Sequence, residues 1–175
     1  MDIETLRARL RYDSEVGSLC WVERPITNSA IHSWNAKFAG TSAGRIDRHG
    51  RLYIRYTDPV IGPRSYQAHR LIWMHYYGVV PAYQIDHIDG NPLNNRITNL
   101  REATHAQNQQ NRGPHKGSES GFKGVARHRA KWSARIYCDG KYYCLGSYET
   151  PEAASAVYEA KARELHGEFA YCAAD

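Results

Sequence analysis

The chain has 175 residues, a formal net charge of +5 and a sequence pI near 9.0. Its hydrophobic content of 42% is spread along the sequence, which is typical of a folded chain and excludes a disordered one. No apolar run reaches the roughly 20 residues of a membrane helix, and the first residues lack the apolar stretch of a secretion signal. We therefore expect a soluble, cytoplasmic protein with a polyanionic partner, no membrane association and no obligate protein partner.

The cysteines give no sign of a zinc site. Cys20, Cys138, Cys144 and Cys172 contain no C-x-x-C pair, and no histidine stands at finger-like spacing from them. The pattern favours free thiols in a reducing compartment.

The first part of the chain predicts short helices and β-hairpins. Apolar residues within 3–10 fall on one helical face, and residues 12–21 indicate a turn followed by a strand. Residues 44–56 alternate on both sides of a His49-Gly50 turn, which predicts a hairpin. Residues 69–77 are apolar at helical spacing and precede Gly78, so we expect a helix there. The hairpin would place arginines on its outer face, among them Arg51 and Arg55.

A break in the pattern divides the chain. Residues 113–120 are rich in Gly, Pro and Ser, and the apolar pattern disappears there. We therefore expect a domain over 1–112, a linker over 113–120 and a second domain over 121–175.

The second domain reads as three strands followed by one helix. Residues 122–129, 131–138 and 141–148 predict the strands, and a helix is expected to start after Thr150 and to end near Gly167. Residues 121–148 contain six Lys or Arg and one acid (6 − 1 = +5), whereas the stretch that follows is acidic. If the helix covers one sheet face, the other face stays basic and aromatic, as in sheets that enter the major groove.

Alternation assigns the faces of the middle strand. Trp132, Ala134 and Ile136 are expected under the helix, and Trp132 is expected to be core. Arg135 is the best single DNA contact on the outward face. Further candidates on the same face or on the first strand, whose parity the sequence leaves open, are Tyr137, Tyr142, Lys123, Arg127 and Arg129.

Residues 83–111 carry the chemistry. A strand ends at Asp86-His87, a polar loop follows, residues 100–103 return as a strand, and Thr104 begins a helix that includes Asn108. Hydrolysis of a phosphodiester needs an activated water and neutralised phosphate charge. His87 could accept the proton of a water, while the oxygens of Asp86 and Asn108 suit Mg²⁺, with Mn²⁺ as the alternative.

These residues resemble the HNH motif of phage-type and intron-type homing endonucleases, which have a ββα-metal fold and use one divalent cation. The resemblance covers the chain up to the linker. It implies that His87 is the general base, that Asp86 and Asn108 are metal ligands, and that Asn99 fixes the loop and orients His87. The third letter of the motif is Asn108, and His105 on the same helix is the rival for its role.

The second domain resembles the APETALA-type (ethylene-response-factor) DNA-binding domain, which docks a three-stranded sheet in the major groove. The resemblance rests on Gly121-Phe-Lys-Gly-Val, Lys131-Trp-Ser-Ala-Arg-Ile, Leu145-Gly-Ser-Tyr148 and the Ala-rich helix. It implies the docking mode, but not the base sequence that is read.

Several residues allow two interpretations. His69 fits a core hydrogen bond as well as an active-site or phosphate contact, and Arg70 could hold the DNA backbone or pair with a carboxylate. Turn chemistry alone explains the loop asparagines Asn91, Asn94 and Asn95, and also the Asp89-Gly90 pair.

The sequence thus predicts an α+β protein: a ββα-metal nuclease domain with N-terminal hairpins, followed by a small three-stranded antiparallel sheet and one helix. We expect a site-preferring endonuclease acting on double-stranded DNA. The alternatives are a non-catalytic DNA-binding regulator that retains the fold, and a nuclease acting on RNA or without specificity.

Overall fold

The computed structural model describes residues 2–58 and 62–171, and it shows an α+β fold of small antiparallel sheets and helices. Contacts divide the chain into two compact units, Met1–Glu102 and Ala103–Asp175. Among the described residues, no helix is long and apolar enough to cross a membrane. Cys20, Cys138 and Cys144 are free thiols, and Cys172 lies outside the described residues.

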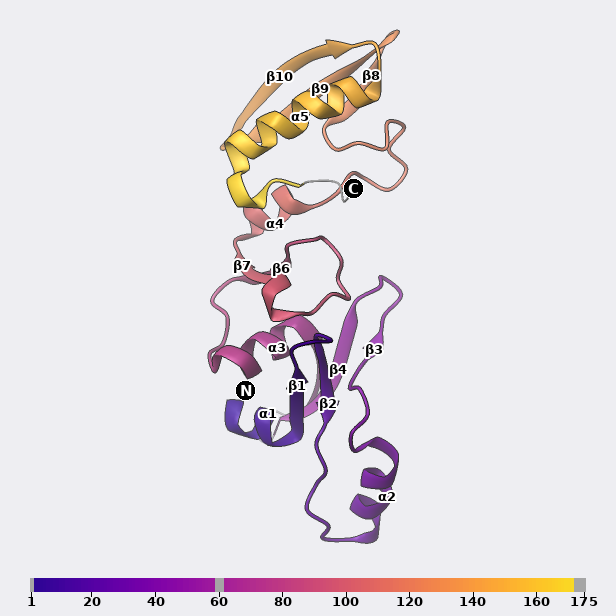
Figure 1. Cartoon of the computed structure of the whole chain (residues 1–175), viewed down its shortest axis with the longest axis vertical. Helices are drawn as coiled ribbons and strands as arrows, with labels where there is room; N and C mark the ends of the chain where they lie inside the picture. Colours follow the sequence, from indigo (N-terminus) through magenta and orange to yellow (C-terminus); the bar gives the residue numbers. More distant parts are fainter. Residues whose placement is uncertain (1, 59–61, 172–175) are drawn as a thin grey trace. The chain divides into compact units, whose positions relative to one another are not determined.

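The first unit contains four helical segments and three small sheets, with β7 at the boundary between the units (Figure 1). In chain order its elements are α1 (Ile3–Arg9), β1 (Leu10–Asp13), β2 (Ser18–Trp21), α2 (Ser29–Phe38), β3 (Arg45–Ile46), β4 (Leu52–Asp58), β5 (Gly62–Gln67), α3 (Ala68–Tyr77), β6 (Gln84–His87), the 3₁₀ turn η1 (Ile97–Asn99) and β7 (Leu100–Ala103).

Helix α3 is the centre of the first unit. It packs against α1, β1, β2, β4, β5 and η1. Its residues Leu71 and Ile72 are fully buried, together with Leu6, Leu10 and Ile54. The helix ends at Gly78, whose φ of 71° lies in the left-handed region that favours glycine. The predicted helices and hairpins of this unit are confirmed. The other predicted elements surround α3.

One α-helix and one strand of the first unit were not predicted. Helix α2 follows the N-cap Asn28, and its own Asn35 side chain binds the backbone N–H and C=O of Arg24, which lies outside the helix. Strand β5 has a polar sequence without alternation, and its pairing with β4 over Gly62–Gln67 holds it in the sheet. Both elements therefore depend on tertiary contacts that a local pattern does not reveal.

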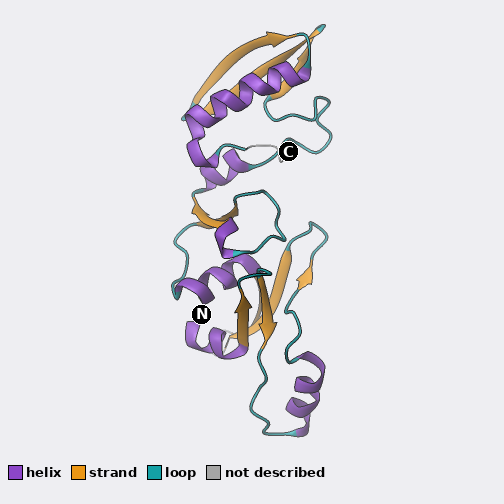
Figure 2. Cartoon of the chain, in the orientation of Figure 1, coloured by secondary structure: helices purple, strands orange, loops and turns teal. Residues whose placement is uncertain are grey.

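The second unit contains one sheet with a long helix on one face (Figures 1 and 2). Its elements are α4 (His105–Asn111), β8 (Val125–His128), β9 (Lys131–Cys138), β10 (Lys141–Tyr148), α5 (Pro151–His166) and the 3₁₀ turn η2 (Gly167–Phe169). The antiparallel strand order is β10-β9-β8, so the longest strands are adjacent. Ala134 and Ile136 of β9 pack against Ala154, Tyr158 and Ala162 of α5.

The predicted three strands and one helix are confirmed, with a shorter first strand that begins at Val125. Before it, Gly124 has a φ of 69° and approaches Tyr158 and the carbonyl of Arg135 so closely that a side chain would collide with both. The segment 122–124 therefore bends under the helix and does not extend the sheet.

The contacts place the unit boundary earlier than the expected linker at 113–120. Helix α4 groups with the second unit because it packs against η2 and because Lys123 holds its last turn. The Lys123 Nζ donates to the carbonyl oxygens of Gln109 at 3.0 Å and Gln110 at 2.6 Å. The functional division into 1–112 and 121–175 remains a prediction.

We predict that Gly124→Ala destabilises the protein by about 3 kcal/mol, because the methyl group would meet the Tyr158 ring as well as strain the backbone. Gly140→Ala is the matched control, since Gly140 also has a positive φ, of 79°, but has open space around it. That variant should lose only about 1 kcal/mol. Urea unfolding of both variants measures the difference, and equal losses would show that the close approach does not matter.

Candidate active site

The β6–β7 hairpin buries two ionisable side chains next to each other. Asp86 and His87, the last two residues of β6, are only 6% and 8% exposed. The backbone N–H of Ile88 donates to the carbonyl of Asn99 at 2.9 Å and closes the loop between the strands. Neighbouring residues of a strand point to opposite faces, so the carboxylate and the imidazole have different surroundings.

Asp86 is paired with Arg101 of the neighbouring strand β7. The Arg101 Nε and Nη2 atoms lie 3.1 Å and 2.9 Å from the Asp86 Oδ2, and both side chains are largely buried. Sequence reasoning did not single out Arg101. The only available signal was its position two residues after Asn99, on the strand that returns beside Asp86.

His87 is held by Asn95 and lies against His69. The His87 Nε2 is 2.9 Å from the Asn95 Oδ1, and the His69 and His87 rings meet edge to face with centroids 5.0 Å apart. Asn95 is only 1% exposed, so turn chemistry does not account for it. The expectation for Asn95 was wrong, because a contact across eight loop residues leaves no periodic trace in the sequence.

Asn99 ties the loop together. Its Nδ2 donates to the Asp89 Oδ1 at 2.9 Å and to the Asn94 carbonyl at 2.8 Å, and its Oδ1 accepts from the Asp89 N–H at 3.1 Å. Burial opposes ionisation of Asp89, but hydrogen bonds from Asn94, Asn99 and the Asn91 N–H hold its pKa below the usual value. Asn99 thus ties the loop together, and Asn95 supplies a hydrogen bond to the His87 ring.

The β1–β2 hairpin braces the same loop. The Tyr12 hydroxyl donates to the Asn95 carbonyl at 3.2 Å and accepts from the Ile97 N–H at 2.9 Å. Gly17 approaches the backbone of Asn95 and Arg96 so closely that a side chain would overlap it, and the Arg96 Nε donates to the Glu15 carbonyl at 2.7 Å. The position of Asn95 is therefore set by a hairpin about 80 residues earlier in the chain.

His69 and the predicted arginines lie in the same unit as His87. Burial is the main reason that the pKa of His69 is lowered to about 3, and the electrostatic effect of His87, Arg70 and Arg51 acts in the same direction. Arg70 donates to the carbonyl of Tyr83 at 3.0 Å, just before β6, and its contact with DNA remains a prediction. Arg51 and Arg55 are exposed, as predicted for the outer face of their hairpin.

Asn108 and its rival His105 lie in α4, which belongs to the second unit. The predicted capping box is confirmed, since the Thr104 Oγ1 accepts from the Gln107 N–H and the Gln107 Oε1 accepts from the Thr104 N–H. In residues 2–58 and 62–171 no group of three or more His, Cys, Asp or Glu side chains could hold a metal. The available donors are instead a buried carboxylate and amide oxygens, which fit a hard divalent cation.

In the second unit, the sheet face opposite α5 is open and aromatic. Arg135, Tyr137 and Tyr142 are exposed there, and the rings of the two tyrosines, which are register partners, lie 4.8 Å apart. Trp132 packs into the core beneath α5. The predicted faces of the middle strand are therefore confirmed.

The remaining candidates of this unit do not share that face. Arg127 is the register partner of Trp132, its guanidinium lies 5.2 Å from that ring, and it pairs with Glu119 at 3.8 Å. It therefore lies on the helix side. Arg129 lies in the turn after β8 with a φ of 57°.

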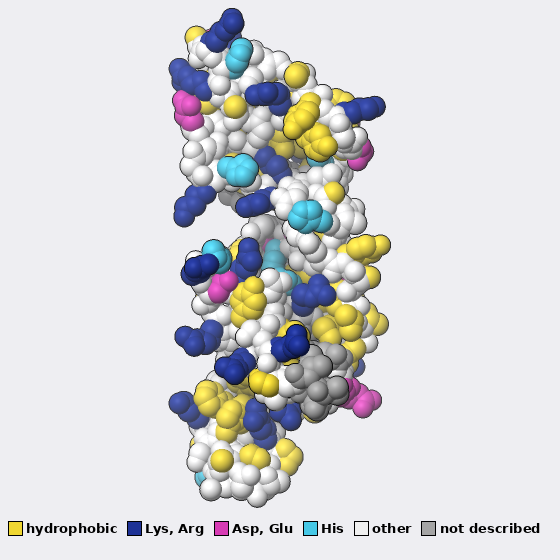
Figure 3. Space-filling model, turned by 180° about the vertical axis from the view of Figure 1, so that it is seen from behind, with side chains coloured by type: hydrophobic (Ala, Val, Ile, Leu, Met, Phe, Trp, Pro, Cys, Tyr) yellow, Lys and Arg dark blue, Asp and Glu magenta, His cyan; other side chains and the backbone are white. Residues whose placement is uncertain are grey.

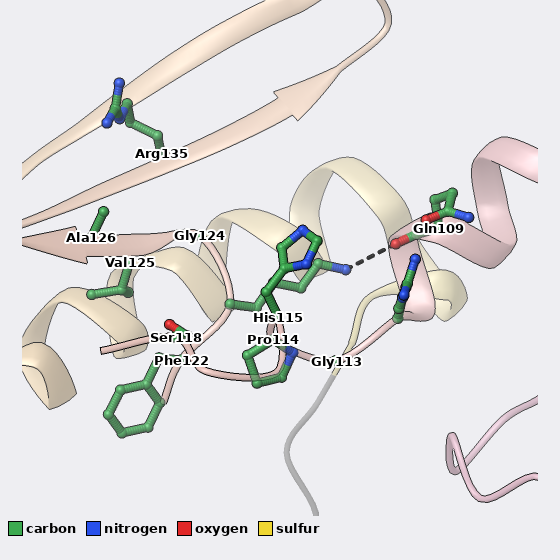
Figure 4. Close-up of a pocket in the computed structure, with 12 residues that line it drawn as sticks. Gln109, Gly113, Pro114, His115, Ser118, Phe122, Gly124, Val125, Ala126 and Arg135 are labelled. Carbon is green, nitrogen blue, oxygen red and sulfur yellow. Dashed lines mark hydrogen bonds between the residues drawn. The ribbon is translucent and has the colours of Figure 1, made fainter. Parts of the chain in front are cut away.

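Lys123 is committed to the last turn of α4 and does not reach the sheet face. It lines a cavity of about 410 Å³ together with Gln109, His115 and Arg135, which are labelled in Figure 4. Burial lowers the pKa of the Lys123 amine to about 8, with a further contribution from Arg112. Its amine therefore serves to join α4 to the sheet.

One face of the molecule is rich in basic side chains. The face shown in Figure 3 carries many Lys and Arg side chains and few Asp and Glu, in keeping with the net charge of +5. Such a surface favours a polyanionic partner.

A family model described as HNH endonuclease matches residues 66–110, which include Asp86, His87, Asn99 and Asn108. Protein 3.8 of Escherichia phage T7 is 38% identical over 105 residues, which are 58% of this chain and 86% of that protein. The uncharacterised HNH endonuclease L560 of Acanthamoeba polyphaga mimivirus is 37% identical over 107 residues, which are 59% of this chain and 55% of that protein.

The SPbeta prophage-derived putative HNH homing endonuclease YosQ of Bacillus subtilis is 39% identical over 64 residues, 36% of this chain and 37% of that protein. A solved structure concerning DNA binding and cleavage by the HNH homing endonuclease I-HmuI aligns with a TM-score of 0.44 and 25% identity, covering 63% of this chain and 55% of that one. The chain thus spans about half or less of these longer relatives. It belongs to the same family as phage T7 protein 3.8 and carries an HNH endonuclease domain.

Proposed function

We propose that this chain is a site-preferring endonuclease of the phage and homing type, which hydrolyses double-stranded DNA with one divalent metal ion. The observation that carries the proposal is the buried pair at the end of β6, where Asp86 and His87 are each held by a partner within the HNH domain. A structural hairpin of this size would not need to bury two ionisable side chains, because each costs free energy unless it is paired.

His87 acts as the general base in this proposal. The Asn95 Oδ1 can only accept a hydrogen bond, so the His87 Nε2 carries the proton and the Nδ1 keeps its lone pair. That nitrogen can take a proton from a water that attacks phosphorus. Asn95 and Asn99 are positioning residues, because one orients the ring and the other fixes the loop.

Asp86 and Asn108 are the proposed metal ligands. A bound Mg²⁺, or Mn²⁺ in its place, would neutralise charge on the scissile phosphate and stabilise the leaving oxygen. The Asp86 carboxylate would bind the ion on one side, and the Asn108 amide oxygen is the second protein ligand that the sequence motif implies.

The second unit would supply affinity and register. In this proposal the open sheet face acts like that of the APETALA-type DNA-binding domain, which the sequence of this unit resembles; the unit has three antiparallel strands with a helix behind them. Arg135, Tyr137 and Tyr142 are the proposed contacts on that face, with Arg51, Arg55 and Arg70 of the first unit along the backbone. Two linked DNA contacts raise the effective concentration of the nuclease at its site.

The decisive experiment is cleavage of phage-sized duplex DNA with Mg²⁺, Mn²⁺ or chelator. We expect cutting at discrete sites that requires metal, and a loss of at least 100-fold in rate for His87→Ala with DNA binding retained. His32→Ala is the matched control, since His32 is an exposed histidine on α2 of the same unit.

If the wild type binds duplex DNA tightly but cuts nothing with either metal, the protein is a DNA-binding regulator that retains the fold. Competition with single strands and structured RNA tests the substrate, and a preference for either would overturn the choice of duplex DNA.

Arg135→Gln should weaken duplex binding and reduce the slope of log affinity against log salt by about 1, because one phosphate contact is lost. Arg163→Gln on α5 removes the same charge from the opposite side of the sheet and should leave both quantities near the wild-type values. Fluorescence anisotropy at several salt concentrations measures them. If both variants bind alike, the open sheet face does not hold DNA.

The depressed pKa of His69 predicts a pH-dependent stability. Below pH 6.5 His69 binds a proton in the unfolded chain, whereas in the folded protein, where its pKa is about 3, it stays unprotonated. The free energy of unfolding should therefore fall as pH drops from 6.5 towards 3, by up to about 1.4 kcal/mol per pH unit from this group. His69→Gln should lose less stability across that window, as measured by urea unfolding at each pH. Unchanged slopes relative to His32→Gln would contradict the assignment.

A further inference from the structure

Arg101 already occupies the carboxylate that the proposed metal would use. Its Nε and Nη2 both lie within 3.1 Å of one atom, the Asp86 Oδ2. The side chains of Arg101 and Asp86 are 11% and 7% exposed, so the pair is largely shielded from water. The two residues lie on the paired strands β6 and β7, so the hairpin itself holds them together.

The Asp86–Arg101 pair compensates the buried negative charge of Asp86 before any metal binds. An isolated buried carboxylate would be unstable, and the guanidinium compensates it with two charge-assisted hydrogen bonds. A lysine would present a single point charge. The planar edge of arginine instead places two N–H groups against one oxygen. The Asp86 carboxylate is thereby compensated and fixed in direction.

The same pair must change when a divalent cation binds. If the cation takes the Asp86 Oδ2, at least one of the two N–H groups loses its acceptor, since both point at that atom. The Arg101 guanidinium stays charged at any working pH and stays tethered to β7, so it needs another anion nearby. A phosphate offers the bidentate oxygen edge that suits it.

We propose that Arg101 takes the place of the metal in the free protein, where its guanidinium holds Asp86. When a divalent cation displaces the guanidinium from Asp86, Arg101 turns to the DNA phosphate. The inference rests on the proposed function. It assigns to Arg101 two consequences of opposite sign: competition with the metal for Asp86, and assistance to the phosphate once metal and DNA are both present. A purely structural ion pair would show only the loss of stability.

The test compares Arg101→Gln and Arg101→Lys with Arg11→Gln, which removes an exposed arginine from β1 of the same unit. Mn²⁺ affinity is measured by titration calorimetry without DNA, with Asp86→Asn as the reference that identifies the site. Thermal midpoints are recorded in chelator and in saturating Mn²⁺. Single-turnover cleavage is measured at saturating Mn²⁺.

Arg101→Gln should bind Mn²⁺ roughly tenfold more tightly than the wild type, on the scale by which neighbouring groups tune metal sites. Its thermal midpoint should fall in chelator and recover more in Mn²⁺ than that of the wild type. Its cleavage rate should fall roughly 100-fold, the size expected for losing one preorganised charge at the phosphate. Arg101→Lys should lie between the two, and Arg11→Gln should match the wild type.

The inference is overturned if Arg101→Gln binds Mn²⁺ no more tightly than the wild type while the wild type binds and cuts. If Arg101→Gln does not fold, the same comparison is decided by Arg101→Lys, which keeps the charge but not the planar edge. If the wild type neither binds Mn²⁺ nor cuts DNA, the proposed function is refuted, and the inference about Arg101 is refuted as well. That result is seen before any variant is made, so the two failures are distinguishable.

Discussion

The burial of Asp86 and His87 side by side on a four-residue strand is the constraint that organises the first unit. Neither side chain tolerates burial without a partner, so each draws a second residue into the interior: Arg101 for the carboxylate and Asn95 for the imidazole. Asn95 is a loop residue and needs its own support, which comes from the hydroxyl of Tyr12. The strand carrying Tyr12 packs in turn on α3, the helix that also carries His69. The apolar core around α3 thus supports the residues that hold the polar site in place.

The second unit follows a different principle, in which the helix covers one face of the sheet and leaves the other to solvent. Strict alternation along β9 places Ala134 and Ile136 in the core and Arg135 and Tyr137 outside. Gly124 lets the chain pass beneath Tyr158, and this close approach brings α5 onto the sheet. Tyr137 and Tyr142 contact each other across neighbouring strands of that face, where such an aromatic pair stabilises the sheet and stays accessible to a partner.

The sequence predicted the elements whose signals lie within a few residues. It missed the elements and partners that depend on contacts between distant residues. Periodicity and turn chemistry located the hairpins, the capped helix at Thr104 and the sheet with its helix, since each signal lies within a few residues. Helix α2 and strand β5 were missed because neighbouring strands and side chains stabilise them. The motif residues of the HNH domain were recognisable, but Arg101 and Asn95 were not, because their importance lies in which buried group they meet. Arg127 was ambiguous for a related reason, since only the register of β8 shows which face it joins.

The hydrogen bond between His87 and Asn95 also bears on how a base can be prepared without changing its charge. A histidine can be tuned by shifting its pKa or by fixing which nitrogen holds the proton. In the proposed mechanism the Asn95 oxygen accepts at Nε2 and leaves the lone pair on Nδ1. The neighbouring His69 supports this arrangement, since a pKa of about 3 keeps it neutral and adds no positive charge beside the base. The cationic groups needed for a phosphate are then supplied by other residues of the same unit, Arg101 and the exposed arginines.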